Sequence, residues 1–248
     1  MDISGRLEYK YWISESFLDD FRADILPYMN YDPFSLIRSD KQYTVRSNYL
    51  DTATLKCYHE KLDGVKIRNK FRIRGYNDPD LSPEVFLEIK RKNQNFISKD
   101  RVHFPYTDLL QLVQHWDPER IPAFDHPKSM EAADKFIFHY LSENLMPIAL
   151  IVYEREAFLC KYGSRLRITF DKVVRTRRPE SITDIYGEHN LMVCRPGFSI
   201  IEIKFYQVLP VWIPALITKY RLKREAISKY TMGVDTLHHQ LPVHIGYY

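Results

Sequence analysis

Hydrophobic and charged positions alternate along several segments of the amino-acid sequence. In residues 6–13, charged Arg6, Glu8 and Lys10 occupy every second position, with mainly apolar residues between them. Because successive side chains of a β-strand point to opposite faces, this alternation predicts a strand with one charged face. Similar patterns predict further strands at residues 43–50, 65–76, 84–92, 98–104, 148–158, 165–174 and 198–206.

Apolar residues at helical spacing lie between and after these strands. Ser14 or Ser16 caps a predicted helix that continues to about Tyr28, with Phe17 and Phe21 on one face. Turn residues between the strands favour antiparallel neighbours over alternating βαβ units, so an α+β fold is predicted. Further helices are predicted at residues 51–61, 106–115, 129–141 and 212–230.

Composition restricts the class of protein. The 248 residues contain no Gly/Ser- or Pro-rich linker, so a single domain over residues 1–248 is expected, with its core at about 6–237. Three scattered cysteines without a CxxC pair favour neither a disulfide framework nor a zinc site. The N-terminus lacks a signal-peptide pattern, and the longest apolar run, residues 208–217, is too short to span a bilayer. A cytoplasmic location is therefore expected.

The net charge of +4 is modest, so the distribution of the charges is more informative than their sum. One predicted strand carries cations at every second position, about 6.6 Å apart on one face. Like charges at this spacing repel, so the row needs water or an anion in front of it. A solvated outer face and an anion-binding face both satisfy this pattern. The row consists of Lys66, Arg68, Lys70, Arg72 and Arg74.

Other predicted strands also carry charged residues two positions apart. Ordinary antiparallel sheets place polar residues outward, but these faces are unusually rich in Arg and Lys. A closed barrel with a polar, water-filled interior satisfies the pattern, and its Arg forks suit a polyphosphate ligand. The few carboxylates suit a divalent cation that bridges phosphate oxygens. The spaced sets are Arg6-Glu8-Lys10, Glu88-Lys90-Lys92, Lys99-Arg101, Arg165-Arg167 and Glu202-Lys204.

Several short motifs occur in the order seen in VTC domains, the polyphosphate polymerase domains of the vacuolar transporter chaperone. The sequence resembles this family, within the triphosphate tunnel (CYTH-like) superfamily, from about Arg6 to Leu237. Single motifs such as residues 87–90 are weakly specific, whereas the ordered set is fairly specific. The matching segments are residues 7–11, 46–51, 70–74, 87–90, 153–158, 166–171, 201–204 and 228–230.

The resemblance implies a closed, eight-stranded antiparallel barrel, the triphosphate tunnel fold, with flanking helices and a C-terminal helix at one tunnel mouth. It implies ATP and inorganic polyphosphate as substrates and a divalent metal, manganese or magnesium, as cofactor. The implied catalytic residues are Lys10, Arg72, Arg74, Arg155, Arg167 and Lys229. The implied substrate-binding residues are Lys66, Arg68, Lys70, Lys90, Lys99, Arg101, Lys204 and Ser228, and the metal candidates are Glu202, Glu8 and Glu88.

The corresponding activity is transfer of the γ-phosphate of ATP to a growing polyphosphate. Two alternatives remain: a triphosphatase that cleaves tripolyphosphate or a nucleoside triphosphate, and a non-catalytic polyphosphate-binding module. Hydrolytic relatives often carry an ExExK arrangement on the first strand, whereas Arg6 occupies the first acidic position here. Glu8 is either a metal ligand or an ion-pair partner of Lys10.

Partners follow from the same resemblance. Eukaryotic VTC proteins carry a transmembrane region and a phosphate-sensing domain, neither of which is recognisable in this sequence, so a separately encoded membrane protein is a candidate partner. The basic segment before Tyr230 also suits contact with membrane phospholipid. Nucleic acid is not an expected partner, because the sequence offers no stacking platform of the kind that single-strand binders use.

Overall fold

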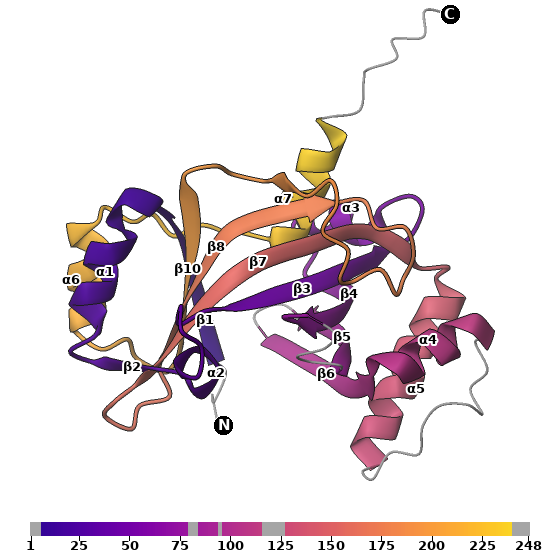
Figure 1. Ribbon diagram of the computed structural model, residues 1–248, viewed down its shortest axis with the longest axis horizontal. Coiled ribbons are helices and arrows are strands. Elements are labelled where there is room, and N and C mark those ends of the chain that lie inside the picture. The colour runs from indigo at the N-terminus through magenta and orange to yellow at the C-terminus, as the bar shows by residue number, and fades with distance from the viewer. Residues whose placement is uncertain (1–5, 79–83, 94–95, 116–126, 240–248) are drawn as a thin grey trace, which may run out of the picture. The chain divides into compact units, whose positions relative to one another are not determined.

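A computed structural model describes residues 6–78, 84–93, 96–115 and 127–239 (Figure 1). The hydrogen-bonded strand order is β1-β10-β8-β7-β3-β4-β5-β6. In addition, β2 pairs with β7, and β9 pairs with β8. The strands are β1 (Arg6–Ser14), β2 (Met29–Tyr31), β3 (Tyr43–Asp51), β4 (Ile67–Tyr76), β5 (Glu84–Asn93), β6 (Phe96–Pro105), β7 (Met146–Cys160), β8 (Arg167–Arg177), β9 (Met192–Val193) and β10 (Phe198–Tyr206). The helices are the 3-10 helix η1 (Glu15–Phe17), α1 (Leu18–Ile25), α2 (Pro33–Leu36), α3 (Lys56–Leu62), α4 (Tyr106–His115), α5 (Pro127–Ser142), α6 (Trp212–Lys219) and α7 (Lys229–His238).

The α+β class and all eight predicted strands are confirmed, with ends that differ by a few residues. Each pairing with a described register is antiparallel. The predicted closure into a barrel is wrong, because β1 and β6 are the two ends of the strand order among the described residues. Alternation within each strand fixes its faces but not whether the first and last strands pair.

The predicted helix over residues 212–230 is also wrong. The segment forms two helices, α6 and α7, and residues 220–228 between them are not helical. Arg221 has a φ of 51°, and the Leu222 amide donates to the Ile217 carbonyl, an arrangement that ends a helix. Arg224 then forms a β-bridge with Tyr11 of β1, so pairing with the sheet replaces helical hydrogen bonds. No helix in the described part of the protein is long and apolar enough to cross a membrane.

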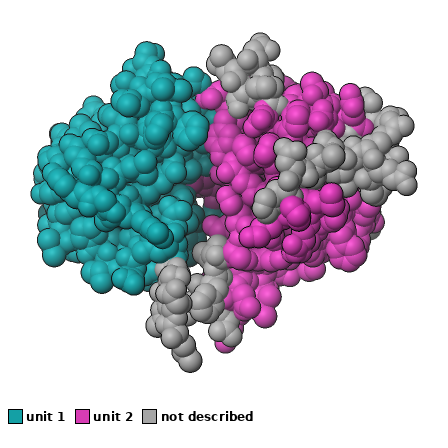
Figure 2. All heavy atoms as spheres, turned by 90° about the horizontal axis from the view of Figure 1, so that it is seen from below, with its two compact units in different colours: residues 1–45, 153–174, 195–228 teal, residues 46–152, 175–194, 229–248 magenta. Residues whose placement is uncertain are grey.

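The chain forms two compact units, shown in teal and magenta in Figure 2. Unit 1 consists of residues 1–45, 153–174 and 195–228, and unit 2 of residues 46–152, 175–194 and 229–248. Strands β3, β7 and β8 each contribute residues to both units. The ends of the expected domain, residues 1–5 and 240–248, lie outside the described residues.

In unit 1, one face of the sheet is apolar and the other is charged. The odd-numbered residues Ile201, Ile203 and Phe205 of β10 are buried in the hydrophobic core. Helices α1 and α6, which lie side by side in Figure 1, cover this core through residues such as Phe21 and Ile213. The even-numbered residues of β10 consequently point to the opposite, charged face.

Unit 2 repeats this division. Several apolar residues of β4, β5 and β6 are buried on one face, among them Phe71, Ile89 and Val102. Helix α5 contributes buried Phe136 to this unit, and its His139 ring lies 5.2 Å from the Phe71 ring. Apolar burial of this kind stabilises a unit by about 25 cal/mol per Å² removed from water. Burial of the apolar face also determines that the charged residues of each strand lie on the opposite face.

A buried carboxylate connects α7 to β3 within unit 2. Asp51 accepts hydrogen bonds from the amides of Cys57 and Tyr58 at 2.9 and 3.0 Å. The Tyr230 hydroxyl donates to the same carboxylate at 2.5 Å. Burial, followed by the nearby charge of Asp51, raises the pKa of Tyr230 far above its ordinary value. The phenol therefore stays protonated and acts as a donor.

Tyr230→Phe is expected to lower the free energy of unfolding by about 1.5–3 kcal/mol, because a buried carboxylate loses one donor. Tyr58→Phe is the matched control, since the Tyr58 hydroxyl also donates to a carboxylate, Asp235, but at a less buried position. Urea unfolding followed by circular dichroism measures both. A loss for the Tyr230 variant no larger than for the Tyr58 variant would contradict the assignment.

Candidate functional site

The register of unit 2 aligns the predicted cations across three strands. Lys70 of β4 pairs with Lys90 of β5, which pairs with Lys99 of β6. Adjacent strands lie about 4.8 Å apart, so these lysines form a row of like charges across the sheet. The adjacent row contains Arg72, Glu88 and Arg101 in the same three strands. The cations predicted along one strand are thus part of a larger basic face that spans β4, β5 and β6.

Glu88 is the central carboxylate of this face, and its side chain is 1% exposed. We call Glu88 and its four cationic neighbours the Glu88 cluster. Burial alone would raise the pKa of Glu88, but the surrounding positive charges hold it well below its ordinary value. The carboxylate therefore stays ionised and neutralises part of the face. Its neighbours are Arg72 at 2.6 Å, Arg101 at 3.3 Å, Lys99 at 3.4 Å and Arg74 at 4.0 Å.

The pKa of Tyr49, in the same unit, reflects the positive charge of the neighbouring side chains. Its hydroxyl accepts a hydrogen bond from Arg72 at 2.9 Å, and its ring stacks on Tyr230 at 5.2 Å. Burial would raise the pKa of Tyr49, but Arg72, Arg74 and Lys229 lower it below its ordinary value. The Glu88 cluster contains four cations and one carboxylate, so its net charge is positive. This excess of positive charge favours an anionic ligand.

Unit 1 holds a second group of alternating charges, which we call the Glu202 cluster: Glu8, Lys10, Arg155, Asp171, Glu202 and Lys204. Lys10 Nζ lies 3.0 Å from Glu8 and 3.4 Å from Glu202. Lys204 Nζ lies 2.8 Å from Glu202 and 3.9 Å from Glu8. Burial, assisted by Arg155 and opposed by the two carboxylates, lowers the pKa of Lys204. Two carboxylates and two ammonium groups thus share one face of β1 and β10.

Arg155 is held in position by a buried partner that sequence reasoning missed. Its Nε and Nη2 atoms donate to the two oxygens of Asp171 at 2.6 and 2.7 Å. A third contact, 3.6 Å from Nη2 to Glu202, connects the pair to the rest of the cluster. The alternating pattern of β8 could have indicated this residue, because Asp171 and Arg167 are four positions apart and therefore lie on the same face of the strand. A bidentate pair fixes the guanidinium plane, so Arg155 presents a preorganised charge.

The structure separates the remaining predicted residues into three environments. Lys66 precedes β4 and is exposed, and the guanidinium of Arg68 donates to the Val65 carbonyl. Arg167 binds Asp32 at 2.9 Å and the Tyr43 hydroxyl at 3.3 Å in unit 1. Ser228 is half-buried at the end of unit 1, and Lys229 is buried at the start of α7 in unit 2.

The three metal candidates have different surroundings. Both oxygens of Glu88 contact cationic side chains, so this carboxylate does not fit a metal ion. Glu8 and Glu202 also contact cations, but both hold the same two lysines, whose flexible stems can turn toward a phosphate ligand. Their oxygens are of the ligand class that magnesium and manganese prefer. The described residues contain no group of three His, Cys, Asp or Glu side chains arranged for a metal ion.

Comparison with known proteins gives a sequence match over most of the chain. The profile of the VTC domain matches residues 5–238. Vacuolar transporter chaperone complex subunit 4 of Schizosaccharomyces pombe is 22% identical and covers 92% of this chain. The subunit 4 of Trypanosoma brucei brucei is 21% identical and covers 97%. This chain spans only 37% and 35% of the lengths of these two relatives.

Solved structures give more remote similarities. A candidate adenylyl cyclase of Hippeastrum with a dominant triphosphatase activity is 13% identical, has a TM-score of 0.49, and covers 94% of this chain and 96% of its own. A candidate adenylate cyclase of Bacillus halodurans is 12% identical, has a TM-score of 0.48, and covers 91% and 94%. The sequence profile, rather than these remote likenesses, establishes the relationship.

Proposed function

Because this chain belongs to the VTC domain family, we propose that it is a polyphosphate polymerase that transfers the γ-phosphate of ATP to polyphosphate. The observation that supports this reaction most strongly is the basic face of unit 2, in which four cations surround Glu88. Unit 1 adds a charged face, the Glu202 cluster, with three cations and three carboxylates. We propose further that residues 1–248 act as one catalytic domain, which the length of the family match supports.

The chemistry of phosphoryl transfer suits such faces. The transferred group carries charge on its equatorial oxygens, and catalysis depends on positioning the reactants and neutralising this charge. The terminal phosphate of polyphosphate is already an anion, so attack on the γ-phosphorus requires no general base. The new P–O bond forms from that terminal oxygen, the bond to the β-phosphate oxygen breaks, and ADP leaves.

The side chains have separate proposed roles. In unit 2, Arg72, Arg74 and Lys90 bind phosphate oxygens, with Glu88 holding the two arginines. Lys70, Lys99 and Arg101 extend this face, and Lys229 adds charge beside Tyr49. In unit 1, Lys10, Lys204 and Arg167 bind phosphate, and Arg155, fixed by Asp171, stabilises developing charge. Lys66, Arg68 and Ser228 are secondary contacts.

Glu202 and Glu8 would hold a divalent cofactor, manganese or magnesium, through their carboxylate oxygens. When bound, such an ion neutralises phosphate charge and helps to orient the reacting groups. Glu202 is the principal candidate, because its side chain is the more buried of the two and it matches the metal-binding Glu that the family resemblance implies. Release of Lys10 and Lys204 from the carboxylates would make both ammonium groups available to phosphate.

We propose a cytoplasmic site of action beside a separately encoded membrane protein. The two curated relatives are named as subunits of a complex, which supports a partner for this chain as well. Co-purification with the partner, followed by mass spectrometry, would identify it.

The balance of phosphate products tests the proposed reaction against hydrolysis. We expect purified protein with ATP, manganese and a short polyphosphate primer to release ADP with less than about one orthophosphate per ten ADP. In the hydrolytic alternative, orthophosphate appears in at least equal amount to ADP, because water accepts the phosphoryl group. Coupled assays for ADP and for orthophosphate on the same sample measure the ratio. Orthophosphate release equal to ADP release would contradict the polymerase proposal.

A further inference from the structure

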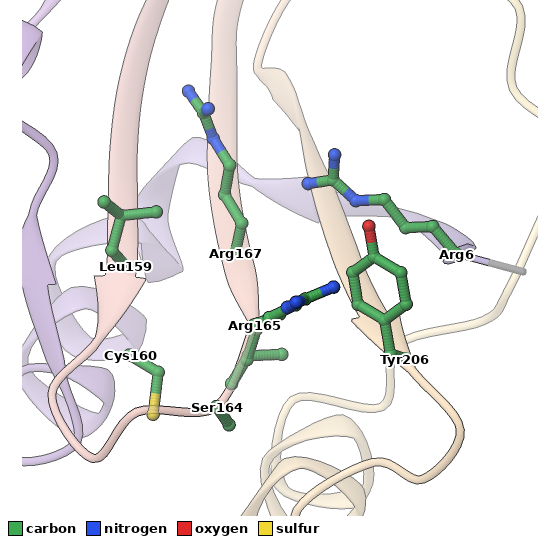
Figure 3. A pocket seen from close by; sticks show the side chains of 8 residues that line it. Arg6, Leu159, Cys160, Ser164, Arg165, Arg167 and Tyr206 are labelled. Carbon is green, nitrogen blue, oxygen red and sulfur yellow. The ribbon is translucent and has the colours of Figure 1, made fainter. Parts of the chain in front are cut away.

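A cavity of about 400 Å³ opens in unit 1 at the ends of β1, β8 and β10. Figure 3 shows Arg6 and Arg165 extending toward Tyr206, with Arg167 farther along β8. The lining residues that the structure describes all belong to unit 1. They are Arg6, Leu159, Cys160, Ser164, Arg165, Leu166, Arg167 and Tyr206.

Strand register places this cavity beside the Glu202 cluster, on the same face. Glu8 pairs with Lys204, and Lys204 pairs with Arg167 in the neighbouring strand. Two positions farther along β1, Arg6 pairs with Tyr206. Positions two apart on a strand share a face and lie about 6.6 Å apart. The cavity thus adjoins the Glu202 cluster on the charged face, two positions beyond Lys204 in β10.

Among the described residues, the lining contains three arginines and no Asp or Glu. Arg167 is oriented by Asp32, and the Arg165 guanidinium lies 5.4 Å from the Tyr206 ring centroid. Arg6 and Arg165 are both exposed to solvent. Guanidinium groups bind phosphate through two parallel hydrogen bonds, and the Tyr206 hydroxyl is a further donor. The cavity therefore suits a multiply charged phosphate ligand better than a neutral one.

We propose that this cavity, the Arg6–Arg165 pocket, binds phosphates of polyphosphate beyond those held by the Glu202 cluster. The proposal rests on the proposed function for the identity of the ligand. A long polyphosphate reaches both the Glu202 cluster and the pocket, whereas tripolyphosphate held by this cluster does not extend into the pocket. Two connected contacts raise the affinity for the longer ligand through a high effective concentration. The pocket thus makes the protein selective for long polyphosphate and retains the product between additions.

Binding of two ligand lengths tests the pocket. The variant Arg6→Ala/Arg165→Ala removes both exposed guanidinium groups, and Arg38→Ala/Arg178→Ala is the control with the same change in net charge. Calorimetry with long-chain polyphosphate and with tripolyphosphate gives the dissociation constants. For the pocket variant we expect about tenfold weaker binding of long polyphosphate, because two charge-assisted contacts are lost. Its affinity for tripolyphosphate should stay within about twofold, which also shows an intact fold.

The control variant should bind both ligands within about twofold of the wild-type protein. An equal loss of affinity for both ligands, or no loss for either, would overturn the pocket proposal. The binding measurement requires no turnover, so it is separate from the test of the polymerase reaction. A wild-type protein that forms no ADP refutes the proposed function, while a length-dependent loss in the pocket variant still supports phosphate binding in the pocket.

Discussion

Replacing Glu202 by Gln is expected to lower ATP-dependent synthesis of polyphosphate by a factor on the order of 1,000. The side chain contacts Lys10, Lys204 and Arg155, and it is the principal proposed ligand for the divalent ion. The amide keeps the size of the carboxylate but loses its charge. Binding of polyphosphate should be unchanged or tighter, because the cluster loses one negative charge. ADP formation and polyphosphate affinity, measured on the same preparation, separate the two effects.

Glu156→Gln is the matched control for this variant. Glu156 is also a buried carboxylate of unit 1, bound to Arg22 at 2.5 Å and Lys172 at 3.2 Å, outside the proposed site. We expect it to lose stability without a specific loss of turnover per folded molecule. Normal turnover by the Glu202 variant, or an equal loss in both variants, would contradict the metal assignment at Glu202.

Replacing Glu88 by Gln should have the largest effect on stability. The four cations of the Glu88 cluster would lose their common counter-charge, which costs about 3–5 kcal/mol for a buried ion-pair network. For a protein of this size the melting temperature should fall on the order of 10 °C. Added tripolyphosphate should restore more stability to this variant than to the wild-type protein, since the phosphate supplies the missing negative charge. Differential scanning fluorimetry with and without the ligand measures both shifts.

Asp184→Asn provides the comparison in unit 2. Asp184 pairs with Arg177, a buried arginine that is not part of the Glu88 cluster. This variant should also unfold at a lower temperature, but tripolyphosphate should stabilise it no more than the wild-type protein. A similar ligand-induced gain in both variants would show that the phosphate effect is nonspecific.

Period-two alternation predicted the strands and their charged faces well, because burial of one face is a local property of each strand. Ile201 and Ile203 lie in the unit 1 core, and Glu202 lies between them on the charged face. The same alternation placed Arg72 and Glu88 on charged faces. Their direct pairing depends on the register between β4 and β5, which is specified by the turn and by cross-strand packing.

The features that the sequence did not reveal are long-range or depend on competing hydrogen bonds. The partner of Arg155 is sixteen positions away, in another strand. Alternation can place Asp171 on the charged face of its strand, but it does not show which cation the carboxylate binds. The helix predicted over residues 212–230 had suitable local composition. It is interrupted because residues near Arg224 pair with β1. The short elements α2, β2 and β9 contain too few residues to show a period.

The most direct test of the central claim is the detection of newly formed phosphoanhydride bonds. Purified protein, ATP, manganese and a short primer would be followed by phosphorus NMR, with product lengths resolved on a gel. We expect the signal of internal polyphosphate groups to grow as ATP is converted to ADP, with products longer than the primer. Accumulation of orthophosphate without internal groups would contradict the account and indicate a triphosphatase. Binding of polyphosphate without any turnover would contradict it as well and indicate a binding module.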